Sequence, residues 1–444
     1  MSLSAENQRL GAVAACRFGL GARPGEIAEA AHDPRGWLVA QLAPAAAPAF
    51  LGLAGSADRL IAVRAADPLD TAGAGQVLSA TLARNEVFAR AHHAATTPHG
   101  FRERWAMFWT NHFALQGGGG GAEMLSGAFV REAIDPHHLG VFDELLLAAE
   151  RHPAMMIALN QSDSVGPRSK VGLATKRGIN ENLARELMEL HSVGVDGGYG
   201  QRDVTELALA LAGWTVGDPG GAPEHRGRFV DDLDRREPGP RQWFSRTWPE
   251  SDGRAEAMLR ELARKPQTRA RLAFKVARHF VADAPPVSLV ARLSDAMARS
   301  GGSLHALATA LVDAPEAWAP TRAKFKTPYE HLISSYRAVG SAPDEPQALL
   351  DRLSGMGHVP LWAASAKGAD DVEQAWATPL ALAQRADFAR SLATRSPFAH
   401  PQDLATSSLG ATLGPDTRRV LASNTLELQD AFALALLSPE FQSR

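Results

Sequence analysis

The chain has little of what several common protein classes require. Its 444 residues include one cysteine, Cys16, which excludes a disulfide within the chain and a zinc site built on several thiolates. No apolar run reaches the roughly eighteen residues that a membrane-spanning helix needs. The net charge of −3 gives no electrostatic reason to expect nucleic-acid binding. The composition therefore favours a protein that neither spans a membrane nor binds nucleic acid.

Several catalytic and targeting signatures are also missing. The sequence contains no GxSxG nucleophile elbow, no SxxK and no HExxH zinc-protease motif. The glycine run Gly117–Gly121 is not followed by the GK[ST] of a phosphate-binding loop, so a flexible lid or a simple spacer is the remaining interpretation. The first residues lack a basic start followed by a sustained apolar run, so no secretory signal is visible. We expect a cytoplasmic protein, with export beside a signal-bearing partner as the alternative.

Helical patterns dominate the sequence, whereas strand patterns are sparse. Hydrophobic residues make up 45% of the chain, which is enough for a substantial core, and Ala, Leu, Arg and Glu dominate segment after segment. Two stretches, Thr215–Glu250 and Gly355–Asp370, lack this periodicity and predict long irregular segments. The sequence therefore predicts an all-α protein, a large multi-helix array with little or no β structure. We expect one unit over residues 1–444, with 215–250 as the place where it would subdivide.

The most polar stretch, Gly178–Trp214, predicts two helices joined by a glycine-rich turn. Asn180 is a suitable N-cap for the first helix, whose leucines recur at helical spacing and form an apolar stripe. Gly194 suits the left-handed residue that ends a helix. The second helix is expected to begin near Asp203, which with Glu206 resembles a capping box. The stretch thus predicts a helical hairpin with a polar lip.

One face of the first helix carries the groups best suited to chemistry. At about 100° per residue, Asn182, Glu186 and Glu189 fall together, with Arg185 beside them. Two carboxylates that share a cavity can separate their pKa values for acid–base work or hold a metal. A structural interpretation is also open, because Arg185 lies four residues from both Glu181 and Glu189 and can form a surface ion ladder with them.

A second candidate segment is the tryptophan-rich stretch Phe101–Leu115, which predicts a helix. Trp109 and His112 share one aromatic face, and Arg104 and Asn111 flank it. Aromatic stripes at this spacing usually belong to a core. A histidine on such a face is more often a hydrogen-bonded core residue than a ligand. The functional alternative places His112 in the same site as the carboxylates.

These groups support the hypothesis of a hydrolase-type enzyme with a buried polar site between helices. One carboxylate acts as general base, and the other as general acid or metal ligand. The predicted catalytic residues are Glu186, Glu189, His112, Asn182 and Arg185. The predicted substrate-binding residues are Arg104, Trp109, Asn111 and Asn160. A divalent metal is an option, with His191 and Asp203 as its predicted ligands. The hypothesis requires His112 and Glu186 to lie in one cavity.

Seven segments along the chain form a recognisable order of motifs. They are Arg17–Glu26, Arg102–Phe113, Arg131–Pro167, Asn180–Trp214, Ala277–Pro286, Phe325–Gly340 and Ser438–Gln442. In this order they resemble the bacterial family known as domain of unknown function 1800. The resemblance covers nearly the whole chain and implies one large, predominantly helical bacterial unit, but no catalytic residue. Two segments depart from the family pattern, the glycine run Gly117–Gly121 and the arginine-rich stretch Arg226–Trp248.

The same resemblance implies a protein partner. Relatives are commonly encoded beside a second protein that bears a twin-arginine signal and is similar to the alkaline phosphatase and sulfatase fold. A non-catalytic hypothesis therefore stands beside the enzyme: a helical scaffold that assembles with such an exported partner. This hypothesis predicts a broad apolar or aromatic surface patch, with Trp243, Phe244 and Trp248 as its candidates.

Overall fold

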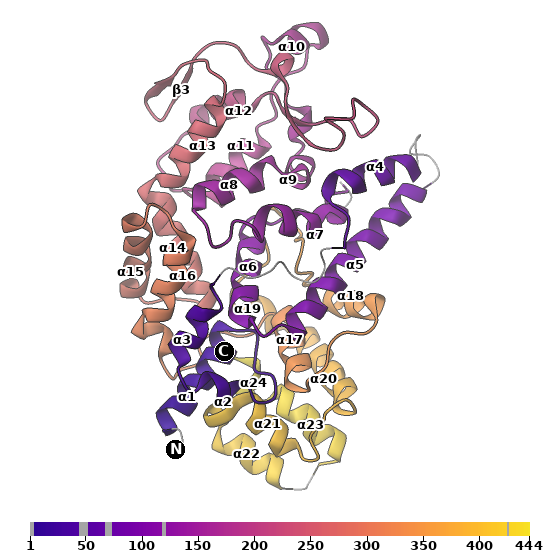
Figure 1. The fold of residues 1–444 in the computed structure, drawn as a ribbon, viewed down its shortest axis with the longest axis vertical. Helices are drawn as coiled ribbons and strands as arrows, with labels where there is room; N and C mark the ends of the chain where they lie inside the picture. The colour runs from indigo at the N-terminus through magenta and orange to yellow at the C-terminus, as the bar shows by residue number, and fades with distance from the viewer. Residues whose placement is uncertain (1–3, 44–51, 67–72, 118–120, 424–425) are drawn as a thin grey trace.

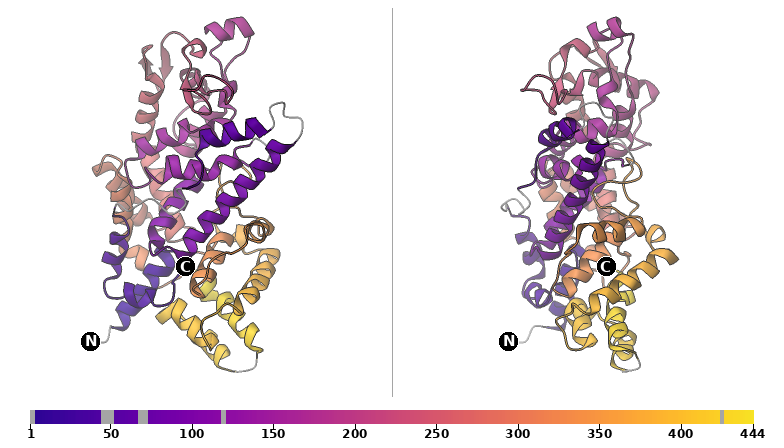
Figure 2. Two further views of the ribbon diagram at one scale, coloured as in Figure 1. Left: turned by 45° about the vertical axis from the view of Figure 1, so that its right-hand side comes forward. Right: turned by 90° about the vertical axis from the view of Figure 1, so that its right-hand side faces the viewer.

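Helices build most of the chain in the computed structural model, which describes residues 4–43, 52–66, 73–117, 121–423 and 426–444 (Figure 1). The molecule is elongated. Both the N-terminal and the C-terminal helices lie at one end of its long axis, and the middle of the chain forms the other end (Figure 1, Figure 2). Named strands in the described ranges occur as two short antiparallel pairs. The predicted all-α class is therefore confirmed. The glycine run Gly117–Gly121 lies largely outside the described residues.

The first part of the chain supplies two groups of helices. The short helices near the N-terminus are α1 (Ala5–Val13), α2 (Glu26–Ala30) and α3 (Pro34–Ala40). Two longer helices, α4 (Ser56–Ala66) and α5 (Ala74–Thr96), pack together and form an arm along one side (Figure 1). The arm borders the central helix of the molecule.

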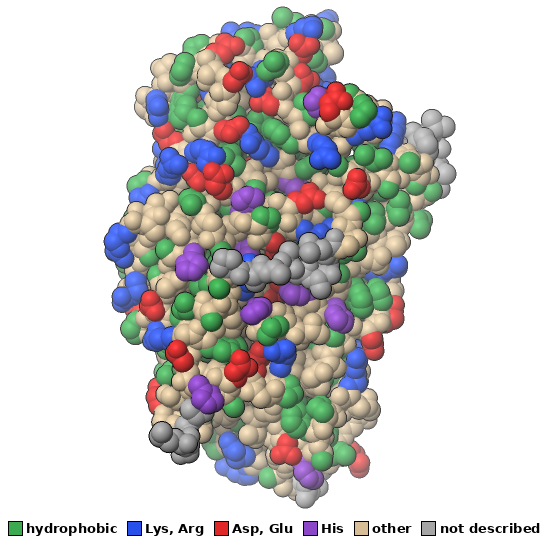
Figure 3. Space-filling view, in the orientation of Figure 1, with side chains coloured by type: hydrophobic (Ala, Val, Ile, Leu, Met, Phe, Trp, Pro, Cys, Tyr) green, Lys and Arg blue, Asp and Glu red, His purple; other side chains and the backbone are tan. Residues whose placement is uncertain are grey.

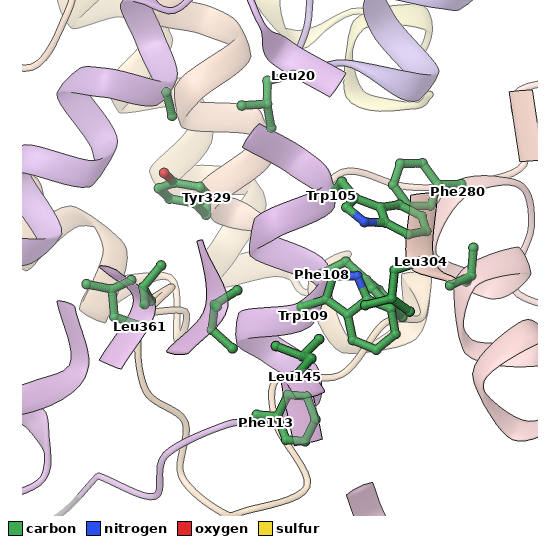
Figure 4. Packing of buried hydrophobic residues seen from close by; sticks show 14 of the residues in the cluster. Leu20, Trp105, Phe108, Trp109, Phe113, Leu145, Phe280, Leu304, Tyr329 and Leu361 are labelled. Atoms are coloured by element: carbon green, nitrogen blue, oxygen red, sulfur yellow. The ribbon is translucent and has the colours of Figure 1, made fainter. Parts of the chain in front are cut away.

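That central helix, α6 (Gly100–His112), holds the aromatic core together. Trp105, Phe108 and Trp109 project from it into a cluster that includes Phe280 (Figure 4). Trp105 and Trp109 are fully buried. Large aromatic side chains at helical spacing remove much apolar surface from water on one side of a helix. The predicted aromatic core stripe is thus confirmed.

The middle of the chain forms the far end of the molecule. Its helices are α7 (Ser126–Phe129), α8 (Phe142–Arg151), α9 (Pro153–Ala158), α10 (Lys170–Thr175), α11 (Asn182–Glu186), α12 (Gln201–Leu211) and α13 (Arg254–Arg264). α11 continues directly into a π-helical turn, Leu187–His191. α11, this turn and α12 make up the predicted helical hairpin, which is confirmed, and Gly194 ends its first arm with a φ of +86°.

The caps of this hairpin differ from those predicted. Glu181, not Asn180, is the N-cap of α11, and the Asn180 side chain accepts from the Asn182 N–H over 2.9 Å. Gly200 is the N-cap of α12, so Asp203 is the third helical residue and accepts from the Gly200 N–H. Both sequence assignments were wrong by one to three residues, because short polar side chains satisfy a helix start from several positions.

The stretch Thr215–Glu250 contains both strand pairs. β1 (Trp214–Val216) pairs with β2 (Phe229–Asp231), and β3 (Arg241–Trp243) pairs with β4 (Arg246–Trp248), both antiparallel. In the second pair Arg241 lies opposite Trp248. The hairpin packs on α12, and Trp243 and Trp248 are 0% and 7% exposed. The predicted aromatic surface patch is therefore wrong, because these indoles complete the core.

The last part of the chain returns to helices. They are α14 (Pro266–Phe280), α15 (Val287–Arg299), α16 (Leu304–Asp313), α17 (Pro328–Ala338), α18 (Pro346–Gly355), α19 (Glu373–Trp376), α20 (Pro379–Ala393), α21 (Pro401–Leu409), α22 (Pro415–Ala422), α23 (Leu428–Leu437) and α24 (Pro439–Gln442). Residues 356–372 connect α18 to α19 without a helix or strand of their own, as the second irregular segment predicts. One hydrophobic cluster extends from Val13 to Phe441. Over the part of the chain that the structure describes, no helix is long and apolar enough to cross a membrane.

Candidate functional site

Helices α6 and α14 contact each other through polar side chains. Arg104 Nε on α6 donates to His279 Nε2 on α14 over 3.3 Å, and Lys275 Nζ lies 2.8 Å from His112 Nδ1. Because the residue numbers run in opposite senses, the two helices are antiparallel. Lys275 and His279 are four residues apart and share a helix face, as do Lys275 and Arg271. We call Arg104, His112, Arg271, Lys275 and His279 the polar seam.

His112 is held in one orientation at the seam. Its buried ring is stacked with Phe108 and lies edge-on to Phe113. Nε2 donates to the backbone carbonyl of His191 over 3.1 Å, so the lone pair of Nδ1 accepts a hydrogen bond from the Lys275 amine. Burial holds the pKa of His112 well below its ordinary value, and the nearby Lys275 lowers it further. The imidazole is therefore neutral and orients the amine.

Lys275 has the chemistry of an activated amine. Burial, and then the positive charge of Arg271 one turn away, lower its pKa to about 7, while Asp371 opposes the shift. An amine with such a pKa is neutral in much of the protein at physiological pH and carries a free lone pair. Desolvation and a neighbouring cation are the means by which proteins activate lysine as a base or nucleophile. Lys275 can therefore accept a proton or attack an electrophile.

A carboxylate–imidazole pair lies behind His112. The π-helical turn Leu187–His191 directs the His191 side chain inward, where Nδ1 donates to Glu150 Oε1 over 2.7 Å. Both side chains are 0% exposed. His191 Nε2 and Glu150 Oε2 have no hydrogen-bond partner in the described part of the chain. The carboxylate therefore orients the imidazole ring through Nδ1.

The predicted carboxylate face lies at the edge of this region. Burial raises the pKa of Glu186, and the charges of His191, Glu189 and Glu150 act on it. Glu186 therefore lies within electrostatic reach of the buried pair. Glu189 pairs with Arg185 over 3.4 Å, and Arg185 also pairs with Glu181 over 3.1 Å. The surface ion ladder predicted as the structural alternative is thus present and consists of Glu181, Arg185 and Glu189. Glu186 is not part of this ladder.

The other end of the seam borders a cavity of about 50 Å³. Its polar lining includes Arg104, Asn111, His279, Glu330 and Asp371. His279 Nδ1 donates to Asp371 Oδ2 over 3.0 Å, and Arg104 donates to Glu330 over 2.8 Å. Asn111 binds both the N–H and the carbonyl of residue 369, so it holds the connection from α18 to α19 against α6. A cavity of this size holds a few water molecules, not a substrate.

The other predicted residues are not brought together with the seam. Trp109 is fully buried among aromatic rings, and Asn182 is exposed. Asn160 is exposed in a left-handed turn with a φ of +54°. Asp203 accepts from the Gly200 and Phe244 N–H groups. Arg104 and Asn111 are the two predicted binding residues that line the cavity.

The two predicted metal ligands have separate partners. His191 donates to Glu150, whereas Asp203 accepts from the Gly200 N–H at the start of α12 and from the Phe244 N–H. Within the described ranges, no three His, Cys, Asp or Glu side chains gather in a way that would hold a metal ion.

The site predicted from the sequence did not include four residues of this region. Arg271, Lys275 and His279 are spaced four apart on one helix, and this spacing was the available signal for a polar face. Glu150 gave no signal, because it lies in an ordinary amphipathic helix and meets His191 only through the fold. His112 and His191 were named, but with different roles.

Comparison with known proteins gives a family and no relative of known activity. No curated protein and no solved structure matches the chain. The sequence profile of the family described as "Protein of unknown function (DUF1800)" matches residues 13–443. The match covers nearly the whole chain and includes every residue of the polar seam. The chain therefore belongs to the DUF1800 family.

Proposed function

We propose that this chain is a hydrolase-type enzyme whose acid–base chemistry takes place at the polar seam, with Lys275 as the proton acceptor. The observation that supports this best is the 2.8 Å contact between Lys275 Nζ and His112 Nδ1. His112 is neutral and already donates to the His191 carbonyl, so it can only accept from the amine. The lone pair of the neutral amine is then directed away from His112.

Each neighbouring group has a part in this proposal. Lys275 removes a proton from the attacking water. His112 acts as a positioning residue that orients the amine. The Glu150–His191 pair fixes the main-chain carbonyl that orients His112. Glu186, whose pKa burial raises, is the candidate acid that protonates the leaving group.

The proposed class of enzyme is the one expected from the sequence, but the proton acceptor is Lys275 and not one of the two carboxylates. The sequence hypothesis relied on Glu186 and Glu189 together, but Glu189 is bound to Arg185. An assembly with a phosphatase-like partner is the alternative. Of its three candidate aromatic residues, Trp243 and Trp248 are buried and Phe244 is half-buried. On the face in Figure 3, charges of both signs are interspersed with small apolar areas. This face therefore does not favour the scaffold over the enzyme.

The test compares the wild type with Lys275→Met on a panel of chromogenic esters, phosphate monoesters, sulfate monoesters and glycosides. Lys170→Met is the control, because Lys170 is exposed and paired with Asp234 at the surface. We expect hydrolysis of one class, a loss of about 10²–10⁴-fold in Lys275→Met, and an unchanged rate in the control. Equal rates in the wild type and in Lys275→Met, or no turnover of any class, would overturn the proposal.

A further inference from the structure

Arg271 differs from the other arginines of the described chain. It is half-buried, yet within the described ranges its guanidinium has no hydrogen bond or ion pair, and its Nε is a buried donor without an acceptor. Every other arginine in the described ranges that is buried or half-buried donates to an acceptor within the protein. A buried unpaired donor costs free energy. The missing acceptor therefore requires an explanation.

The backbone around Arg271 is shaped to admit its side chain. A methyl group in place of a Gly194 hydrogen would lie 2.9 Å from Arg271 Nη1, and Gly194 has a φ of +86°. The positive φ is the condition that favours glycine here, and the absent Cβ leaves room for the guanidinium. Gly194 lies three residues after His191 in the hairpin formed by α11 and α12. The contact with Gly194 therefore places Arg271 beside the proposed site. The guanidinium is thus packed in a defined position without a protein anion.

The charges near Arg271 and Lys275 leave a local excess of positive charge. His112, from α6, is neutral. Asp371, from the connection to α19, already binds His279 and Lys324. Arg278, further along α14, donates to the carbonyl of Asp283. The buried carboxylate of Glu150 is bound to His191. Tyr199, which acts electrostatically on Arg271, is a phenol whose pKa burial raises above its ordinary value of 10, so it carries no charge near pH 7. Neither cation therefore has a carboxylate of its own.

We infer that Arg271 binds an anionic oxygen group of the substrate, a carboxylate, phosphate or sulfate, beside the Lys275 amine. The inference rests on the proposed function, because it assigns the substrate class of that same site. A guanidinium offers parallel N–H donors that match the oxygens of such groups. The donors of Arg271 have no acceptor in the described protein and are therefore available to a ligand. The substrate is thus an anion, and Arg271 determines this specificity.

Anion binding would change the proton affinity of Lys275. The charge of Arg271 is one cause of the low pKa of Lys275. An anion on Arg271 offsets that charge, so the pKa of Lys275 rises and the amine takes up a proton near neutral pH. Binding of a simple anion is therefore linked to proton uptake, and the uptake requires Lys275.

The experiment is calorimetric titration of the full-length protein with inorganic phosphate, sulfate and acetate, in buffers of different ionisation enthalpy. We expect saturable binding of at least one anion by the wild type, with uptake of a fraction of a proton near pH 7. Arg271→Gln should bind at least tenfold more weakly. Arg299→Gln, which removes an exposed charge from α15, should bind like the wild type.

Further variants separate this inference from the proposed function. Lys275→Met should still bind the anion but without proton uptake. Arg271→Lys keeps the charge and serves as the folded comparison if Arg271→Gln unfolds; weaker binding than in the wild type is the expected result. Equal anion affinity in the wild type, Arg271→Gln and Arg271→Lys would overturn the subsite and leave Lys275 chemistry untouched. Intact binding with unimpaired turnover in Lys275→Met would instead overturn the proposed function alone.

Discussion

The pH dependence of lysine acylation would test the seam without knowledge of a substrate. The perturbation is brief treatment of the folded protein with trace acetic anhydride at pH values from 5 to 10, followed by quantification of each acetylated lysine by peptide mass spectrometry. Only a neutral amine reacts, so the labelling rate of a lysine follows its fraction of neutral amine. We expect the Lys275 rate to rise around pH 7 and to level off above it.

The magnitude follows from the pKa of about 7. At pH 7.5 this value leaves roughly three quarters of the Lys275 amines neutral, whereas an ordinary lysine is neutral in only about one molecule in a thousand. Lys170 is the internal control, because its hydrogen bond to Asp234 raises its pKa above the ordinary lysine value. Limited access lowers the Lys275 rate at every pH but does not move its midpoint. A Lys275 rate that still rises beyond pH 9, in parallel with Lys170, would refute the reasoning.

The low pKa of Lys275 also makes the stability of the folded protein depend on pH. The pKa of this amine in the folded protein lies below the value of 10.5 expected in the unfolded chain. Between about pH 7 and pH 10.5 the unfolded chain therefore binds more protons, and this group makes the folded state more stable as pH rises. Lys275→Met removes the dependence. The wild type should gain stability relative to Lys275→Met across this window, by about 2–5 kcal/mol, in urea denaturation at a series of pH values.

Three substitutions test the surrounding contacts. Glu150→Ala leaves the buried His191 donor unpaired and should cost about 1–3 kcal/mol of unfolding free energy, measured in urea; no measurable loss would contradict the buried pair. Arg185→Ala removes two exposed ion pairs and should cost less than about 1 kcal/mol, and a larger loss would give this ladder a structural role it lacks here. Asn111→Ala should speed hydrogen exchange in residues 360–371 and leave α6 protected; unchanged exchange there would show that other contacts hold the segment.

The features predicted correctly from the sequence are those encoded by local spacing. The aromatic stripe of α6 follows from a helical period of 3.6 residues, and Gly194 follows from the steric cost of a positive φ. These patterns need no knowledge of the fold. The buried position of Trp105 and Trp109 is the direct result.

The contacts that make the site depend on distant segments. Lys275 and His112 are separated by 163 residues, and His191 and Glu150 by 41. Helical spacing shows which residues share a face but not which helix that face contacts. The same limit explains the wrong surface patch at Trp243 and Trp248, since irregular sequence does not reveal that a hairpin covers α12. The predicted pairing of carboxylates with His112 stays a prediction for Glu186.

The π-helical turn Leu187–His191 makes this region sensitive to insertions and deletions. A helix that gains one residue in a single turn rotates everything downstream by about 100°. The direction in which the His191 side chain projects therefore depends on the number of residues in that turn as well as on the identity of the residue. Loss of one residue there would return the spacing to that of a regular helix and swing the imidazole away from its carboxylate. Deletion of one codon in this turn is therefore expected to break the hydrogen bond between His191 and Glu150.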